Sequence, residues 1–215
     1  MNESSQVRED ICRIAKSMFD RGLTSGASGN ISARLLDGSL LMTPTGSSMG
    51  FLDPARISHL SADMRLISGD PPTKEIPLHA AFYETRSTAG AVVHLHSTHS
   101  VALSMLPEVD PDNVLPPLTP YGIMRLGKVK LLPFFLPGDP QMGEAVRGLA
   151  GRRSAVLLAN HGPVVAAKDL WAAANAMEEL EETAKLAILT RGLHPRALTE
   201  AQVGQLVTRF EIEWD

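Results

Sequence analysis

Two histidines separated by one residue, His94 and His96, form the most informative pattern in the sequence. They fall at the end of an apolar run over 91–96, which predicts a β-strand. Because side chains alternate along a strand, both imidazoles would point to one face, with Val93 and Leu95 on the other. Two imidazoles on one face can share a metal ion. Alone, the pattern is weak and is more typical of two histidines that are exposed or bonded within the protein.

Two residues elsewhere in the chain extend this candidate metal site. His161 follows an apolar strand predicted over 156–159, and the adjacent Gly162 lets its ring project from the end of that strand. Glu75 stands at the start of a helix predicted over 77–86, one turn before His79 on the same face. Three imidazoles and one carboxylate suit a borderline ion such as zinc, since the carboxylate can leave when a substrate arrives.

Ordinary explanations compete for these residues. The helix dipole favours a carboxylate in the first turn whatever its function, and this applies to Glu75. For His79 we favour a surface position or a supporting role behind the ligands. The other histidines have no comparable partners in the sequence; these are His59, His99 and His194.

A second group of residues predicts an anion site. Gly29 and Asn30 follow a turn rich in Ser and Gly, and a Thr-Pro-Thr-Gly run over 43–46 closes the next strand. Backbone N–H groups exposed at glycines, with hydroxyl and amide side chains around them, form an anion-binding nest. Lys74, next to Glu75, adds a cation at a helix N-terminus. Each loop alone is also typical of an ordinary turn.

The composition excludes several classes of protein. The chain of 215 residues is 44% hydrophobic, which is enough for a full core and too much for a disordered chain. Its net charge of −4 disfavours nucleic acid as a partner. The single cysteine, Cys12, excludes an intramolecular disulfide and indicates a reducing compartment. Residues 1–10 lack a signal sequence, and the longest uncharged stretch, 87–107, is too polar to span a membrane. We therefore expect a cytoplasmic protein.

The predicted elements define the fold class. An amphipathic helix ends near Gly22, and a hairpin turns at Asp37-Gly38. A long helix near the C-terminus carries four glutamates that we expect mostly on its solvated side, at 178, 179, 181 and 182. Hairpins and mixed connections, with no regular βαβ repeat, predict one α/β domain over 1–215: a three-layer α/β/α arrangement around a mostly antiparallel sheet. Further elements are predicted as strands over 31–35, 40–42, 129–135 and 164–167, and helices over 140–150 and from 199.

Taken together, these motifs resemble the class II aldolase/adducin family over roughly residues 7–210. The resemblance implies that Glu75, His94, His96 and His161 bind Zn²⁺. It implies a homotetramer with active sites at subunit contacts, and an acid/base role for Tyr121. It also implies a pocket for the substrate phosphate, formed by Ser28, Gly29, Asn30, Thr45, Gly46, Thr73 and Lys74.

Within the family, the sequence is most similar to the branch that decarboxylates 3-oxo-tetronate 4-phosphate. The pair Thr73-Lys74 replaces the Ser-Ser of the sugar-phosphate aldolases, and the segments 43–48, 95–99, 116–119 and 136–140 have the decarboxylase pattern. The resemblance implies a zinc-dependent loss of carbon dioxide through a metal-stabilised ene-diolate, giving dihydroxyacetone phosphate. Glu75 would deliver the proton, with Tyr121 as a second candidate, and Lys74 would hold an anionic group of the substrate.

Two alternatives remain open at this stage. One is a zinc-dependent sugar-phosphate aldolase or epimerase, although the epimerases usually carry Asp where Glu75 stands. The other is a metal-free, adducin-like binding module, although such members lose the histidines that this sequence keeps.

Overall fold

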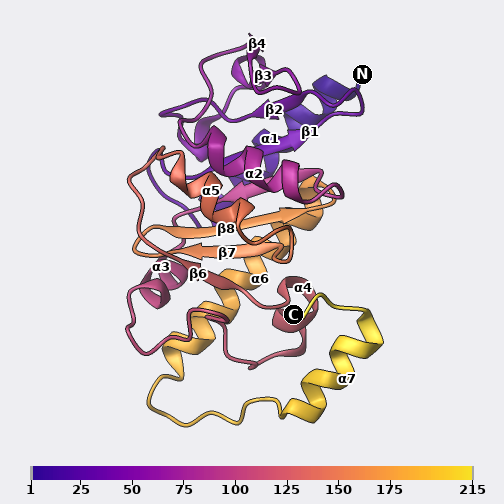
Figure 1. Cartoon of the computed structure of the whole chain (residues 1–215). Coiled ribbons are helices and arrows are strands. Elements are labelled where there is room, and N and C mark those ends of the chain that lie inside the picture. Colours follow the sequence, from indigo (N-terminus) through magenta and orange to yellow (C-terminus); the bar gives the residue numbers. More distant parts are fainter. Residues whose placement is uncertain (1, 215) are drawn as a thin grey trace.

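The computed structural model describes residues 2–214, and an eight-stranded sheet forms its centre (Figure 1). The strand order is β4-β3-β2-β1-β5-β8-β7-β6. Among the neighbouring strand pairs within residues 2–214, β6 and β7 run parallel and the others run antiparallel. This confirms the predicted mostly antiparallel sheet. The strands are β1 (Asn30–Arg34), β2 (Leu40–Met42), β3 (Ser58–Leu60), β4 (Leu66–Ser68), β5 (Ala91–His94), β6 (Lys130–Leu132), β7 (Ala155–Leu158) and β8 (Gly162–Ala167).

Helices cover both faces of the sheet, which confirms the three-layer arrangement. Alternation along β5 sends Val93 into a core with α1 (Glu3–Asp20) and α6 (Leu170–Leu189), and Val92 into a second core with α2 (Ile76–Thr85) and α5 (Gln141–Arg147). Figure 1 shows α2 and α5 in front of the sheet. The remaining helices are α3 (Thr98–Ser104), α4 (Pro120–Leu126) and α7 (Glu200–Phe210), with 3-10 turns η1 (Met49–Phe51) and η2 (Pro54–Arg56).

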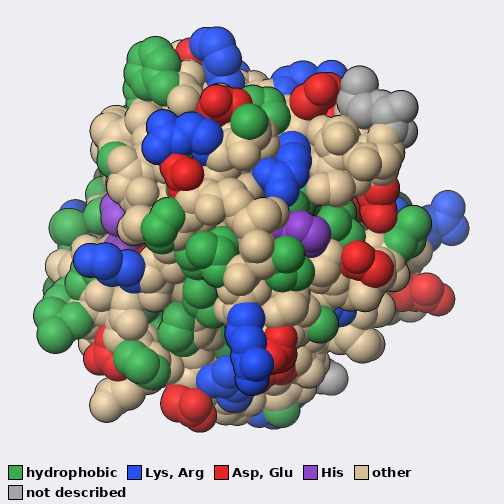
Figure 2. Space-filling view, turned by 90° about the horizontal axis from the view of Figure 1, so that it is seen from above, with side chains coloured by type: hydrophobic (Ala, Val, Ile, Leu, Met, Phe, Trp, Pro, Cys, Tyr) green, Lys and Arg blue, Asp and Glu red, His purple; other side chains and the backbone are tan. Residues whose placement is uncertain are grey.

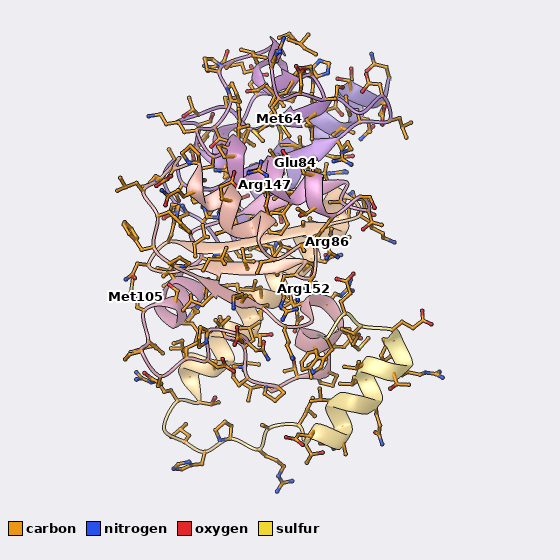
Figure 3. The ribbon with its side chains drawn as sticks, viewed as in Figure 1. Met64, Glu84, Arg86, Met105, Arg147 and Arg152 are labelled. Atoms are coloured by element: carbon orange, nitrogen blue, oxygen red, sulfur yellow. The ribbon has the colours of Figure 1, made fainter. Side chains whose placement is uncertain are left out.

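The two helices of the front layer are joined by a bidentate ion pair. Arg147 Nε lies 2.6 Å from Glu84 Oε2, and Arg147 Nη2 lies 3.0 Å from Glu84 Oε1. Figure 3 shows these two side chains next to each other between α5 and α2. The pair is partly exposed, so its main effect is to fix the direction of the helices, while the apolar core below supplies the stability. Helix α2 is thereby held over the sheet with its N-terminus at one edge.

Several predicted elements are shorter in the structure. The strand expected over 91–96 ends at His94, the strand over 129–135 is β6 (Lys130–Leu132), and the helix over 140–150 is α5 (Gln141–Arg147). The chain leaves β5 after His94 because Leu95 and Ser97 turn it toward α3; Ser97 Oγ donates to the carbonyl of Leu23 at 2.8 Å.

The prediction that the glutamates of α6 lie mostly in solvent is wrong for Glu181, which is buried. Its Oε1 accepts from the backbone N–H of His99 at 2.9 Å, and its Oε2 accepts from that of Ser100 at 2.9 Å. Unpaired N–H groups at the start of a buried helix need an acceptor, and Glu181 supplies it to α3 from the neighbouring helix. The ring of His99, which has no comparable partner nearby in the sequence, also lies within 2.8 Å of Glu181 through Nδ1.

The molecular surface carries charges of both signs. Seen from the β4 end, Lys and Arg side chains are interspersed with Asp and Glu (Figure 2). On this face they do not gather into a basic field of the kind that binds a phosphate backbone. Within residues 2–214, none of the helices has the length and apolar character needed to cross a bilayer.

The core of the front layer makes a stability prediction. Phe82 on α2 is fully buried between the sheet and α5, so Phe82→Ala leaves a cavity and should lower the free energy of unfolding by about 3–5 kcal/mol. The matched control is Leu36→Ala, since Leu36 is 93% exposed; it should change the value by less than about 0.5 kcal/mol. Urea unfolding measures both, and equal effects would contradict this assignment of the core.

Candidate metal and anion site

Three imidazoles and one carboxylate converge at one edge of the sheet. His94 ends β5, His96 follows it, His161 lies in the turn between β7 and β8, and Glu75 is the N-cap of α2. The candidate ligand nitrogens of the three histidines lie within 4.8 Å of one another. The Nε2 atoms of His94 and His96 are 3.2 Å apart. Glu75 Oε2 is 3.4 Å from His94 Nε2, and Glu75 Oε1 is 3.5 Å from His161 Nε2.

Two glycines allow these segments to approach each other. A Cβ on Gly162 would lie 2.2 Å from the carbonyl oxygen of Leu95, so only glycine lets the β7–β8 turn pack against the end of β5. Gly29 has φ +82°, and a Cβ there would lie 2.8 Å from the carbonyl oxygen of His94. The His-Gly and Gly-Asn pairs in the sequence therefore have a geometric basis.

The protonation of the site suits a metal ion. His94 Nδ1 donates to the carbonyl of Pro163 at 2.9 Å, which leaves the lone pair of Nε2 directed at the cluster. Burial, followed by repulsion from His94, lowers the pKa of His96 to about 4 and also lowers that of His161. The His96 and His161 rings are therefore neutral near pH 7, the form that binds metals.

The Glu75 carboxyl completes the donor set as an anion. Burial acts to raise its pKa, but the positive charge of a protonated His94, a hydrogen bond from Asn30 and the positive charge of a protonated His161 outweigh burial at the low pH where the carboxyl titrates, and its pKa lies below its ordinary value. Neutral imidazoles and a carboxylate directed at one point are stabilised by a positive charge among them. Nitrogen and oxygen donors in this number fit a divalent ion with open positions for a substrate, as in catalytic zinc sites.

A cavity of about 210 Å³ adjoins these ligands. It is lined by Glu75, His96, His161 and all seven residues predicted for the phosphate pocket: Ser28, Gly29, Asn30, Thr45, Gly46, Thr73 and Lys74. Sequence reasoning missed Pro137 and Gly138, which line it from the β6–α5 connection. A Cβ on Gly138 would lie 3.2 Å from Lys74 Cβ, so this connection packs directly on the lysine.

The hydrogen-bond donors around the cavity differ in whether they already have a partner within the protein. The Ser28 hydroxyl donates to the carbonyl of Ser25 at 2.6 Å, and the Thr45 N–H donates to that of Pro71 at 2.9 Å. Thr73 Oγ1 accepts from the Asn30 amide and from the N–H of Glu75, both at 3.2 Å, so its own hydroxyl hydrogen can be offered to a ligand. The Thr73 hydroxyl and the exposed Lys74 ammonium are thus the side-chain groups best placed for an anion.

Two predicted residues lie in different surroundings from those expected. His79 is fully buried, so the surface position considered for it is wrong; its ring bonds Asn30 and Ser32, behind the ligands. Sequence reasoning also missed Ser32, although a polar residue alternating with Asn30 on an apolar strand is a usable signal. Tyr121 is 59% exposed in the first turn of α4 and is not among the residues that line the cavity of this chain.

Comparison with known proteins defines the class. Residues 9–188 match the family model for the Class II Aldolase and Adducin N-terminal domain, and the chain belongs to this family.

Individual members of the family are similar to this chain over nearly its whole length. The 3-oxo-tetronate 4-phosphate decarboxylase of Escherichia coli K12 is 50% identical over 200 residues, covering 93% of this chain and 94% of the relative. The protein of that name from Cupriavidus necator is 46% identical over the full length of both. The solved structure of YgbL from Escherichia coli, described only broadly as an aldolase/epimerase/decarboxylase, superposes with a TM-score of 0.92 at 48% identity, covering 95% of this chain and 99% of that one. An L-fuculose 1-phosphate aldolase gives 0.84 at 26% identity, covering 96% of each.

Removal of one ligand should release the metal. His96→Ala leaves two imidazoles and a carboxylate, so zinc bound after dialysis should fall well below one equivalent, as measured by elemental analysis. The control is His194→Ala, because His194 is exposed and distant in sequence from the ligands; it should keep the parental content. Full zinc content with unchanged affinity in His96→Ala would show that the four-ligand assignment is wrong.

Acid should destabilise the metal-free protein. The pKa of His96 falls from 6.5 to about 4 and that of buried His79 to about 3, so unfolding takes up protons below pH 6.5. The free energy of unfolding should therefore fall as the pH drops from about 6.5 toward 4, by at most about 1.4 kcal/mol per pH unit for each proton. In urea titrations, His96→Ala should show a shallower fall; a parental free energy that is level or rises toward pH 4 would contradict these shifts.

Proposed function

We propose that the protein is a zinc-dependent decarboxylase of 3-oxo-tetronate 4-phosphate, which it converts to dihydroxyacetone phosphate and carbon dioxide. The observation that carries this proposal is one cavity that combines an imidazole-carboxylate donor set with a lysine and a hydroxyl suited to an anion. Relatives that are 45–50% identical over at least 93% of this chain bear the name of this activity.

The substrate matches the two ends of the cavity. It carries a ketone beside a carbon that bears a hydroxyl and the carboxylate, and a phosphate at its far end. His94, His96, His161 and Glu75 would hold the ion, which when bound withdraws electron density from the ketone and stabilises the charge left by departing carbon dioxide. The Thr73 hydroxyl and the backbone around Gly29 and Gly46 would hold the phosphate.

The chain must also supply a proton. The electron pair of the broken C–C bond stays on the carbon that loses carbon dioxide, and that carbon then takes up a proton. Glu75 is the one carboxylic residue among the described residues that line the cavity, and we assign the proton delivery to it. Its carboxylate, once displaced from the ion by the substrate, would take up a proton from solvent and pass it to that carbon. Tyr121 is the second candidate; its exposure leaves it free to reach the site of a neighbouring subunit in the homotetramer that we also propose.

The negative charge of the proposed substrate gives Lys74 a role in the cavity. A molecule with both phosphate and carboxylate carries about three negative charges near neutral pH, of which a divalent ion neutralises only part. Lys74 lines the cavity beside Glu75, and its ammonium can pair with the remaining charge. It must not bind the carboxylate too tightly, because ground-state stabilisation does not accelerate the reaction.

A sugar-phosphate aldolase is the second candidate, favoured by the 26% identical L-fuculose 1-phosphate aldolase structure. The deciding experiment supplies the zinc-loaded protein with 3-oxo-tetronate 4-phosphate or with L-fuculose 1-phosphate and measures the release of carbon dioxide and of aldehyde. We expect carbon dioxide from the first substrate and at most traces of aldehyde from the second. The opposite result would favour the aldolase.

Glu75→Gln should separate metal and substrate binding from proton delivery. The amide keeps the shape of the side chain but cannot carry a proton at neutral pH. With zinc at saturation, we expect substrate affinity to survive while turnover falls by roughly two to four orders of magnitude. Near-normal turnover would remove Glu75 from this step and favour Tyr121.

Lys74→Ser tests the role of the cation. The loss of a charge-assisted contact should weaken transition-state binding by about 2–4 kcal/mol, measured as kcat/KM for decarboxylation. Zinc content should not change, because Lys74 is not among the proposed ligands. Equal kinetics for Lys74→Ser and the parent, at low and high salt, would indicate an ordinary surface lysine.

A further inference from the structure

A continuous run of hydrogen bonds leads from the Glu75 carboxylate into the core under α2. Asn30 Nδ2 lies 2.7 Å from Glu75 Oε2, and Asn30 Oδ1 lies 2.5 Å from His79 Nε2. His79 Nδ1 lies 2.7 Å from Ser32 Oγ, which lies 2.8 Å from the Tyr83 hydroxyl. The five residues are between 0% and 7% exposed. Buried polar groups in this number need a reason, since an apolar core would fold as well.

The donor and acceptor roles in this run are fixed at its Asn30 end. Both hydrogens of the Asn30 amide are used, one toward Glu75 Oε2 and one toward Thr73 Oγ1. The Asn30 Oδ1 atom must therefore accept, and His79 Nε2 must carry a hydrogen.

Donor and acceptor roles can also be assigned to the hydrogen bonds farther from Glu75. Full burial lowers the pKa of His79 to about 3, so the ring is neutral and its Nδ1 accepts. The Ser32 hydroxyl must then donate to His79 Nδ1, and it in turn accepts from the Tyr83 hydroxyl. Every hydrogen in the run thus points toward the Glu75 carboxylate.

We propose that His79, acting through Asn30, is a positioning residue that holds the Glu75 carboxylate in its orientation for metal binding. His79 fixes the rotation of the Asn30 amide, because a turned amide would place its NH₂ group against the hydrogen of His79 Nε2. The fixed amide then directs a hydrogen at Glu75 Oε2 and keeps the two oxygens opposite the rings of His94 and His161. Supporting partners of this kind typically change metal affinity 10- to 100-fold.

The fold makes this support rigid. Asn30 and Ser32 lie on β1 and face the same side of the sheet, while Glu75 and His79 lie one turn apart on α2. The hydrogen bonds therefore tie the N-terminus of α2 to a central strand at the depth of the ligands. The expected effect of His79 on zinc affinity does not depend on the identity of the substrate. The expected effect on turnover rests on the proposed decarboxylase activity.

A pair of substitutions at one position separates positioning from mere packing. Leucine at 79 fills the space without a donor, whereas glutamine can place an amide N–H near the position of Nε2. We measure the dissociation constant of Zn²⁺ by competition with a chelator, and kcat and KM at saturating zinc. His79→Leu should weaken zinc binding at least tenfold and lower kcat at least tenfold, with KM changed less than threefold. His79→Gln should recover most of both losses.

His59→Leu is the matched control, because His59 is also bonded to a serine, Ser39, at 3.0 Å but belongs to β3 and does not line the cavity. It should leave the zinc affinity and kcat within twofold of the parent. Should His79→Leu fail to fold, Ser32→Ala takes its place, since it removes the donor to His79 Nδ1; it should weaken zinc binding three- to tenfold.

The zinc affinities of these variants test the positioning role separately from the decarboxylase activity of the parent. Equal zinc affinities for His79→Leu and His79→Gln, or a parental zinc affinity for His79→Leu or for its substitute Ser32→Ala, would overturn the positioning role even if the parent releases carbon dioxide. Weaker zinc binding that glutamine restores would support the positioning role even if the parent showed no decarboxylase activity.

Discussion

The burial of an ionised Glu75 carboxylate beside three histidines is the constraint on which the rest of the site depends. A buried carboxylate is costly unless positive charge and hydrogen-bond donors surround it. Here Asn30 supplies a donor at 2.7 Å, and the neighbouring rings of His94 and His161 are aimed at its two oxygens. A divalent ion among these groups would complete the compensation. The candidate metal site therefore depends on the same packing that buries Glu75.

The fold meets this constraint by bringing ends of elements together. The antiparallel register pairs Asn30 with His94 across β1 and β5, and the β7–β8 turn presents His161 at the same edge. The N-terminus of α2 adds Glu75, since the apolar face of this helix packs on the sheet. None of these contacts is local in sequence, so the chemistry exists only when both cores have formed.

Much of this arrangement could be predicted from the sequence. Strand alternation predicted that His94 and His96 share one face, and their Nε2 atoms do lie 3.2 Å apart although β5 ends at His94. The hairpin and helix patterns indicated the three layers. The burial of other residues depends on contacts between elements that are far apart in the sequence. Glu181 follows a solvated pattern yet is buried, because α3 needs an acceptor that lies far away in sequence. The burial of His79 likewise depends on Ser32 and Asn30 across the sheet, which helical spacing does not reveal.

X-ray absorption spectroscopy at the zinc edge of the purified, metal-loaded protein tests the central claim most directly. We expect a first shell of nitrogen and oxygen at about 2.0–2.1 Å with the multiple scattering of three imidazoles. Glu75→Gln and His96→Ala should each alter that shell, the second by the loss of one imidazole. A shell that contains sulfur at about 2.3 Å, or one with no imidazole scattering, would contradict the account.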